Sequence, residues 1–200
     1  MANTLAQHLG FADPDLGSPE HDRLVTWLTE PETLLVILRR AWPQVLDEKH
    51  AGAQVIVGVA RQDGSCGTDQ DGVVWERVTH VALEKPILRD GSYVVGFVDA
   101  VATVGWGLDG RALVQATFYV EAKPRIQSVG ALLRQVNLYR LYAPGSHWVV
   151  VCNDSQHRPL LYDQGIALVT PADIVSDPPE CRQAAVPSSL TAETSPPDGV

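Results

Sequence analysis

The stretch Val114–Tyr142, VQATFYVEAKPRIQSVGALLRQVNLYRLY, predicts a strand that is followed by an amphipathic helix. The strand ends in a Glu-Ala-Lys triplet, and because side chains alternate across a strand, Glu121 and Lys123 are expected on the same face. Gln135 and Tyr139 are four residues apart on the helix and therefore share a helical face. The stretch thus brings a carboxylate, an ammonium, an amide and a phenol to one end of an apolar strand.

A second carboxylate is expected on the preceding strand. Tyr93–Val104, YVVGFVDAVATV, is a nearly continuous apolar strand that Asp99 interrupts. A tight turn over Gly105–Gly110 connects it to the strand Arg111–Lys123, which predicts an antiparallel hairpin. A buried ionised carboxylate costs several kcal/mol unless a cation or hydrogen bonds compensate. Asp99 and Glu121 are expected on neighbouring strands, where a cation between them would relieve their repulsion.

The residue types around this pair favour a metal site. Oxygen ligands suit magnesium or manganese, and the backbone carbonyl of Ala122 can add a ligand to those of Asp99 and Glu121. A lysine beside a bound divalent cation, here Lys123, can position or deprotonate an attacking water and neutralise charge that develops on a phosphate. The amide and the phenol on the helix can orient a ligand, the phosphate or the lysine.

The same residues also allow a purely structural interpretation. Asp99, Glu121 and Lys123 can form a partly exposed ion network at a strand end, and such networks mimic active sites. Tyr139 can be a tyrosine at the edge of the core whose hydroxyl is satisfied by a hydrogen bond. The residues alone leave both interpretations open.

In this order and on these elements, Asp99, Glu121-Ala122-Lys123 and Gln135-x-x-x-Tyr139 resemble the PD-(D/E)XK nuclease superfamily. The Gln-x-x-x-Tyr helix is similar to that of its RecB-like exonuclease branch, and Gly96-Phe97-Val98-Asp99 matches the Gly-x-x-Asp found there. The similarity covers about residues 73–170.

This resemblance implies an α/β fold with a restriction-endonuclease-like mixed central β-sheet flanked by helices. It implies magnesium-dependent cleavage of DNA or RNA phosphodiesters. It further implies that Asp99 and Glu121 are metal ligands and that Lys123 is the catalytic lysine. Gln135 and Tyr139 would be supporting site residues.

The chain departs from the family pattern at some positions. Val98, and not a proline, precedes Asp99. Many RecB-like nucleases carry an upstream Gly-x-x-x-His metal histidine, and Gly17-Ser-Pro-Glu-His21 fits that string within a poorly patterned N-terminus. Glu32 and Glu84 are the other candidates for a further metal ligand, and the choice stays open. The three cysteines are far apart and exclude the iron–sulfur members, which need four.

The element order predicts one α/β layer domain over residues 21–175, between a loosely ordered N-terminus (1–20) and a disordered tail (176–200). Besides the elements above, we expect helices at 21–28 and 29–42 and strands at 53–60, 73–87, 147–152 and 166–169. Trp106 is expected at the exposed tip of the hairpin, whereas core positions are expected for Trp27, Trp42 and Trp75.

The composition is that of an ordinary soluble globular protein. The net charge of −9 argues against a broad nucleic-acid-binding surface. The strip Pro124–Asn153 nevertheless contains no acidic residue, and Arg125, Arg134 and Arg140 fall within it. This strip is the candidate nucleic-acid contact, with chance clustering as the alternative. Neither a secretion signal nor a membrane span is recognisable, so we expect a cytoplasmic protein without membrane association.

The leading hypothesis is a magnesium- or manganese-dependent nuclease that acts on DNA. The alternative is a non-catalytic module of the same fold that binds nucleic acid or protein, which the acidic net charge and the lack of an obvious target-recognition domain favour. A toxin-like or phage-defence nuclease would share the chemistry. No helicase motif is present, so a helicase or defence-system partner would be a separate chain. The sequence leaves open whether the protein forms homo-oligomers, whether the substrate is DNA or RNA, and whether cleavage is endo- or exonucleolytic.

Overall fold

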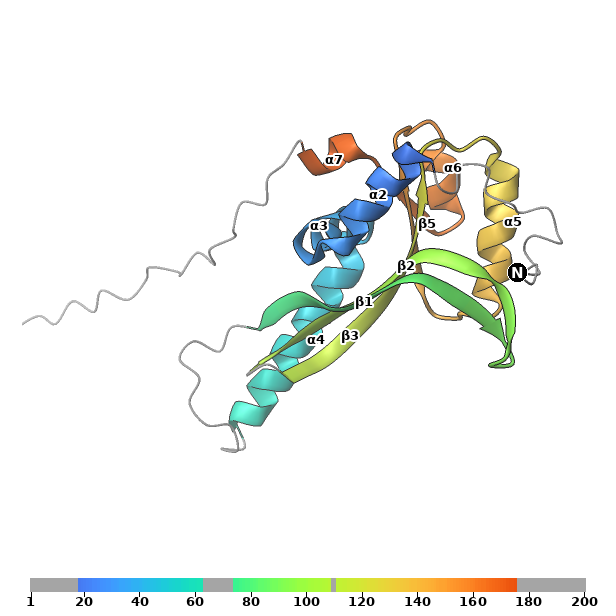
Figure 1. Cartoon of the computed structure of the whole chain (residues 1–200). Coiled ribbons are helices and arrows are strands. Elements are labelled where there is room, and N and C mark those ends of the chain that lie inside the picture. Colours follow the sequence, from blue (N-terminus) through green and yellow to red (C-terminus); the bar gives the residue numbers. More distant parts are fainter. Residues whose placement is uncertain (1–17, 63–73, 109–110, 176–200) are drawn as a thin grey trace, which may run out of the picture.

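The computed structural model describes residues 18–62, 74–108 and 111–175. These residues form a five-stranded mixed β-sheet flanked by helices (Figure 1). The predicted disordered tail, and all of the predicted loose N-terminus before Ser18, lie outside the described residues. The elements are α2 (Pro19–Thr29), α3 (Pro31–Ala41), α4 (Pro43–Gln62), β1 (Trp75–Arg89), β2 (Tyr93–Leu108), β3 (Arg111–Lys123), α5 (Val129–Arg140), β4 (His147–Cys152), α6 (Arg158–Asp163), β5 (Ile166–Val169) and α7 (Pro171–Val175).

The sheet combines a hairpin with a parallel half. Its strand order is β1-β2-β3-β4-β5. β1, β2 and β3 pair antiparallel, as the short predicted connections require, whereas β4 and β5 run parallel to β3. The connections that run through α5 and α6 allow these parallel pairings. β3 is therefore the central strand, with β1 and β2 on one side and the parallel strands β4 and β5 on the other.

The helices next to the hairpin begin where the sequence carries start signals. Ser18 caps α2, because its hydroxyl accepts a hydrogen bond of 3.1 Å from the backbone N–H of His21. Proline occupies the first turn of both α2 and α3. Ser128 caps α5 in the same way, with its hydroxyl accepting from the backbone N–H of Ala131. These starts were predicted within a few residues.

The predicted strand at residues 53–60 is wrong, because these residues belong to the 20-residue helix α4. The helix starts at Pro43 and continues through Gly52 without a break. Leu46 and Ala53 are both buried in the core, and their spacing of two helical turns fits a period of 3.6 residues. A short apolar run is compatible with a strand or a buried helix, and here the helical segment before it decides.

The sheet is covered on both faces, which gives three layers (Figure 1). One face packs against α2, α3 and α4, and the other against α5 and α6. Alternation along β4 divides its side chains between the two layers: Val149 and Val151 face the first group of helices, and Trp148 and Val150 face the second. The same alternation in β3 turns Ala122 into the first layer, opposite to the face that Glu121 and Lys123 share.

Trp106 is not at an exposed hairpin tip. β2 runs on to Leu108, so Trp106 lies within the strand, is fully buried, and donates a hydrogen bond of 2.9 Å to the Glu76 carboxylate. Gly107 allows the two strands to approach, because an added Cβ would lie 1.8 Å from the Arg111 carbonyl oxygen. Three other tryptophans expected in the core are only partly buried, namely Trp27, Trp42 and Trp75.

Candidate active site

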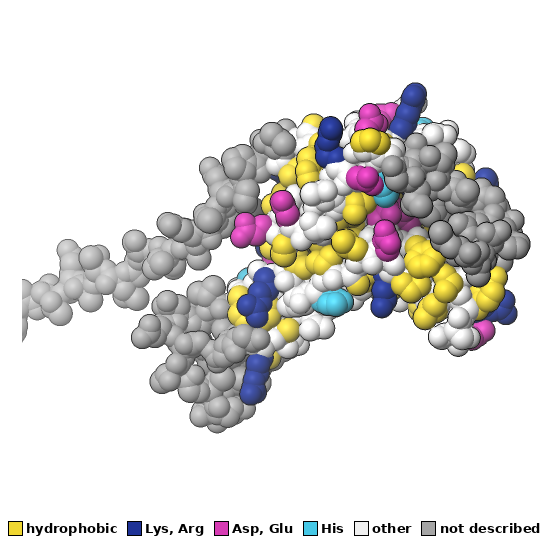
Figure 2. Space-filling view, in the orientation of Figure 1, with side chains coloured by type: hydrophobic (Ala, Val, Ile, Leu, Met, Phe, Trp, Pro, Cys, Tyr) yellow, Lys and Arg dark blue, Asp and Glu magenta, His cyan; other side chains and the backbone are white. Residues whose placement is uncertain are grey.

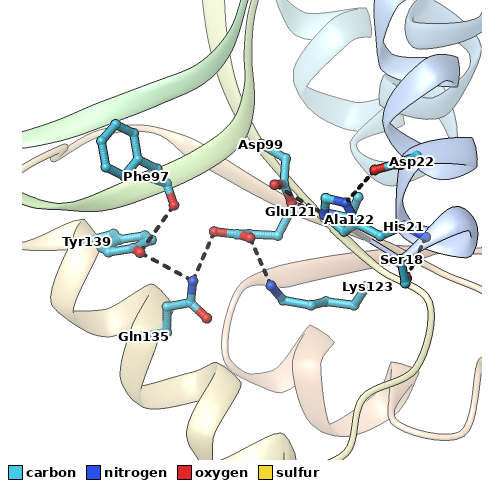
Figure 3. A network of polar contacts seen from close by, with 10 residues as sticks. All are labelled: Ser18, His21, Asp22, Phe97, Asp99, Glu121, Ala122, Lys123, Gln135 and Tyr139. Carbon is cyan, nitrogen blue, oxygen red and sulfur yellow. Dashed lines mark hydrogen bonds and ion pairs between the residues drawn. The ribbon is translucent and has the colours of Figure 1, made fainter. Parts of the chain in front are cut away.

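The candidate site lies where β2 leaves β3. The last paired residues of these strands are Ala100 and Val120, while β3 continues to pair with β4 as far as Lys123. Beyond the last pair, the Asp99 carboxylate accepts a hydrogen bond of 2.7 Å from the backbone N–H of Ala122 (Figure 3). A side-chain oxygen therefore replaces the main-chain acceptor that β2 no longer supplies, and this bond fixes Asp99 beside β3.

Asp99 also lies at a distortion of the other strand pair. In the β1–β2 register, Leu83 pairs with Ala100 and Lys85 with Val98, so Glu84 faces Asp99. Glu84 adopts a φ of 46°, in the left-handed region that non-glycine residues rarely occupy. Its side chain is exposed. The hairpin that β1 and β2 form bends along its length (Figure 1).

Glu121 is a buried carboxylate, only 2 % exposed. Lys123 Nζ lies 3.3 Å from its Oε2, and Gln135 donates a hydrogen bond of 3.3 Å to its Oε1. Burial raises the pKa of Glu121 to about 8, with the Asp99 carboxylate adding to this rise and the Lys123 ammonium opposing it. The effect of burial on this carboxylate therefore outweighs that of the lysine beside it.

Tyr139 connects α5 to the hairpin. Its hydroxyl accepts a hydrogen bond of 3.3 Å from the Gln135 amide and donates one of 3.2 Å to the Phe97 carbonyl. Burial, together with the nearby Glu121 charge, raises the pKa of Tyr139 to about 12, so the phenol remains a donor at neutral pH. A Cβ at Gly96 would lie 2.2 Å from the hydroxyl oxygen, which explains the glycine of the Gly-x-x-Asp motif.

His21 is brought to Asp99 by the first turns of α2. Its ring is buried, and Nε2 lies 3.4 Å from Asp99 Oδ1 (Figure 3). Both ring nitrogens are buried without a hydrogen-bond partner. Of the three candidates for a further ligand, His21 contacts Asp99, whereas the side chains of Glu32 and Glu84 are exposed. The Gly-x-x-x-His string was the sequence signal for this contact.

The donor set fits a divalent cation in its chemistry. It combines two carboxylates, an imidazole whose nitrogens make no hydrogen bond, and the Ala122 carbonyl. This carbonyl points to the same side of β3 as the Ala122 N–H that binds Asp99. Within residues 18–62, 74–108 and 111–175, however, no three His, Cys, Asp or Glu side chains are already grouped as ligands of one ion. Lys123 and the Ala122 N–H bind Glu121 and Asp99 instead.

The three arginines of the acid-free strip differ in their surroundings. Arg125 and Arg134 are exposed. Arg140 donates hydrogen bonds of 2.8 and 2.6 Å to the carbonyls of Gln164 and Gly165, which ties α5 to the segment before β5. Arg140 therefore has a structural task, and the two exposed arginines are the ones available for a nucleic-acid backbone.

The molecular surface near the site is mixed in character. Figure 2 shows acidic side chains gathered between α2 and the hairpin, and apolar side chains on the outer part of the hairpin. The large exposed apolar residues of that part are Leu83, Leu88, Tyr93 and Phe97. None of the helices in the described ranges has the length and apolar character needed to cross a membrane.

No protein-family model matches the chain, and no match was found among curated proteins or among solved structures. The assignment of a function therefore rests on the geometry described above.

Proposed function

We propose that this chain is a metal-dependent nuclease of the PD-(D/E)XK type that hydrolyses phosphodiester bonds of DNA. The observation that supports this proposal is a single polar network at one end of the sheet. Asp99 and the Glu121–Lys123 pair come from adjacent strands, and Gln135 and Tyr139 reach the same point from α5 (Figure 3). An isolated ion pair at a strand end would not need the partly buried Gln135 amide and the buried Tyr139 phenol.

The fold is compatible with this proposal. A restriction-endonuclease-like fold has a mixed central sheet flanked by helices. The described residues likewise form a mixed sheet with helices on both faces. Asp99 lies on β2, and Glu121 and Lys123 lie on β3, which pairs with it. The helix α5 follows directly after β3.

Asp99, Glu121 and the Ala122 carbonyl would hold magnesium or manganese, with His21 as a further ligand. When bound, the ion polarises a phosphoryl oxygen and lowers the pKa of a coordinated water. The cation would also favour the ionised form of the buried Glu121, so deprotonation of Glu121 would accompany its binding.

Lys123 and α5 would perform the remaining tasks. The Lys123 ammonium, held 3.3 Å from Glu121, would orient the attacking water and neutralise charge on the phosphate. Gln135 holds Glu121 through a hydrogen bond, and Tyr139 in turn holds the hairpin through the Phe97 carbonyl. The exposed Arg125 and Arg134 would contact the DNA backbone outside this centre.

The proposal is tested by incubating the purified protein with single-stranded, duplex and branched DNA in magnesium, in manganese and in EDTA. We expect cleavage with either metal and none with EDTA. Lys123→Met, which keeps the bulk of the side chain, should abolish cleavage, and Lys85→Ala, which removes an exposed lysine from β1, should not. Equal background cleavage by the wild type and Lys123→Met on every substrate would reject the catalytic assignment.

A second candidate is a non-catalytic module of the same fold that binds nucleic acid or protein. It is favoured by the lack, in the described part of the chain, of three grouped acidic, histidine or cysteine ligands. Calorimetric titration with manganese separates the two candidates. Binding that disappears in Asp99→Asn supports the nuclease, whereas an intact protein that binds no metal supports the module.

A further inference from the structure

A hollow of about 230 Å³ runs beside α2. It is lined by Glu20, Arg23, Leu24, Trp27, Asn153 and Pro171. The four residues from α2 recur at helical spacing, on a face adjacent to the one that buries His21. Asn153 follows β4, whose last residue pairs with Lys123. The hollow and the candidate site therefore adjoin the same end of the sheet.

The lining groups fit a flat heteroaromatic ring. Trp27, which is partly exposed, contributes an indole ring to the lining, and the buried Leu24 contributes an apolar side chain. Asn153 carries both donor and acceptor atoms, and the Glu20 carboxylate accepts hydrogen bonds such as those of base amino groups. Glu20 and Arg23 place one negative and one positive charge on the lining, so the hollow has no excess positive charge that would select a phosphate, and a nucleobase fits it better than the sugar-phosphate backbone does.

The spacing along α2 relates the hollow to the cleavage centre. Trp27 is six residues after His21, or about 9 Å along the helix axis. A short stretch of a nucleic-acid strand can cover this distance. Arg23 lies between the two positions in sequence and can face the phosphate that joins them. A nucleobase at Trp27 can thus belong to the strand whose phosphate lies near His21.

We propose that the hollow binds an unpaired nucleobase, stacked on Trp27, of the strand that is cleaved. The preferred substrate is then DNA with a single-stranded segment at the cleavage position, because a paired base cannot enter the hollow. This inference rests on the proposed nuclease function for the position of the cut, but the stacking itself can be measured without cleavage.

The test measures binding of a fluorescent single-stranded oligonucleotide and of a hairpin duplex, both in EDTA so that neither is cut. Trp27→Ala should weaken single-strand binding by about 5- to 150-fold, the range seen on removal of stacking aromatics. Trp27→Phe should stay within about threefold of the wild type, because it retains an aromatic face. Duplex binding should be the same in all three proteins.

Tyr162→Ala is the matched control, since Tyr162 is an aromatic residue that is 65 % exposed on α6, outside the hollow. Circular dichroism establishes that each variant is folded, and Asn153→Ala, which changes an exposed side chain, gives an independent readout if Trp27→Ala does not fold. Asn153→Ala should also weaken single-strand binding and leave duplex binding unchanged.

The outcomes distinguish this inference from the nuclease proposal. Single-strand binding that is unaffected by both Trp27→Ala and Asn153→Ala would overturn the base-binding hollow, even if the protein cleaves DNA. Binding that depends on Trp27 without any cleavage in magnesium or manganese would support the hollow and reject the nuclease. An equal loss on single strands and duplex would also overturn the proposal, because the hollow accepts only an unpaired base.

Discussion

The Asp99 carboxylate accepts a hydrogen bond of 2.7 Å from the backbone N–H of Ala122, at the point where β2 and β3 stop pairing. Asp99 therefore has two separable tasks. One oxygen satisfies a main-chain donor of the sheet, and the other faces His21 at 3.4 Å. In the proposed nuclease the same carboxylate also binds the metal.

Substitutions at Asp99 should separate these tasks. Asp99→Asn keeps an oxygen that accepts from Ala122 but removes the charge, so the melting temperature should change little while manganese affinity is lost. Asp99→Ala leaves the Ala122 N–H without its partner, which should cost about 1–3 kcal/mol in the free energy of unfolding. Thermal melting and calorimetric titration of both variants provide the measurements. Similar melting temperatures for the two variants would show that the bond does not support the fold.

The contact between Gly96 and Tyr139 predicts a second pair of outcomes. In Gly96→Ala the new methyl would meet the Tyr139 hydroxyl oxygen at 2.2 Å, so the hairpin or α5 must shift. Overpacking of this kind costs about 1–3 kcal/mol, and the movement should also lower the cleavage rate. Thermal melting together with a cleavage assay checks both effects.

Gly52→Ala is the control for this substitution. An added Cβ at Gly52 has no neighbour within 4 Å, and alanine favours the α4 helix, so this variant should be as stable as the wild type or more stable. If Gly96→Ala melts at the same temperature as the wild type, the close approach of Tyr139 is not a constraint on the fold.

The arginines of α5 should differ in their effects on DNA binding. Arg134 is exposed, and its replacement by alanine should weaken DNA binding and reduce the dependence of log K on log salt concentration by about one unit. Arg140→Ala removes the bonds to the Gln164 and Gly165 carbonyls, which should cost about 1–3 kcal/mol of stability and leave the salt dependence unchanged. Salt titrations of DNA binding and thermal melting compare the two variants. The reverse pattern would assign the DNA contact to Arg140.

The parts of the fold and site that sequence could predict are those governed by local patterns. Alternation predicted that Glu121 and Lys123 share a face, and the short connection to β2 predicted the hairpin that brings Asp99 to them. The structure also has Gln135 contacting Glu121, which agrees with their expected placement at one end of the strand.

Other features depend on packing between distant segments. The contact of His21 with Asp99 follows from how α2 lies against the hairpin, and a motif string alone does not determine it. The run at 53–60 is ambiguous by itself, and only its continuity with the helix from Pro43 excludes a strand. Arg140 counts as a basic residue in the sequence, but its guanidinium binds carbonyls 24 and 25 residues away.

The buried Glu121 predicts a dependence of stability on pH. Its pKa is raised from the ordinary value of 4.5 to about 8 in the folded protein, so the folded state holds a proton that the unfolded chain releases. The stability that this proton contributes is fully present below about pH 4.5 and is lost as the pH rises through about 8. Without metal, the melting temperature should therefore decline across this range.

Glu121→Gln and added metal should each remove this decline, for different reasons. The glutamine variant has no proton to lose, so its profile should be flatter than that of the wild type between pH 4.5 and about 8. Magnesium or manganese binds the deprotonated carboxylate, so its stabilising effect on the wild type should grow as the pH rises, and it should be weak in Glu121→Gln. Melting curves of both proteins across this range, with metal and with EDTA, measure these differences. A glutamine variant that retains the wild-type slope would assign the pH dependence to groups other than Glu121.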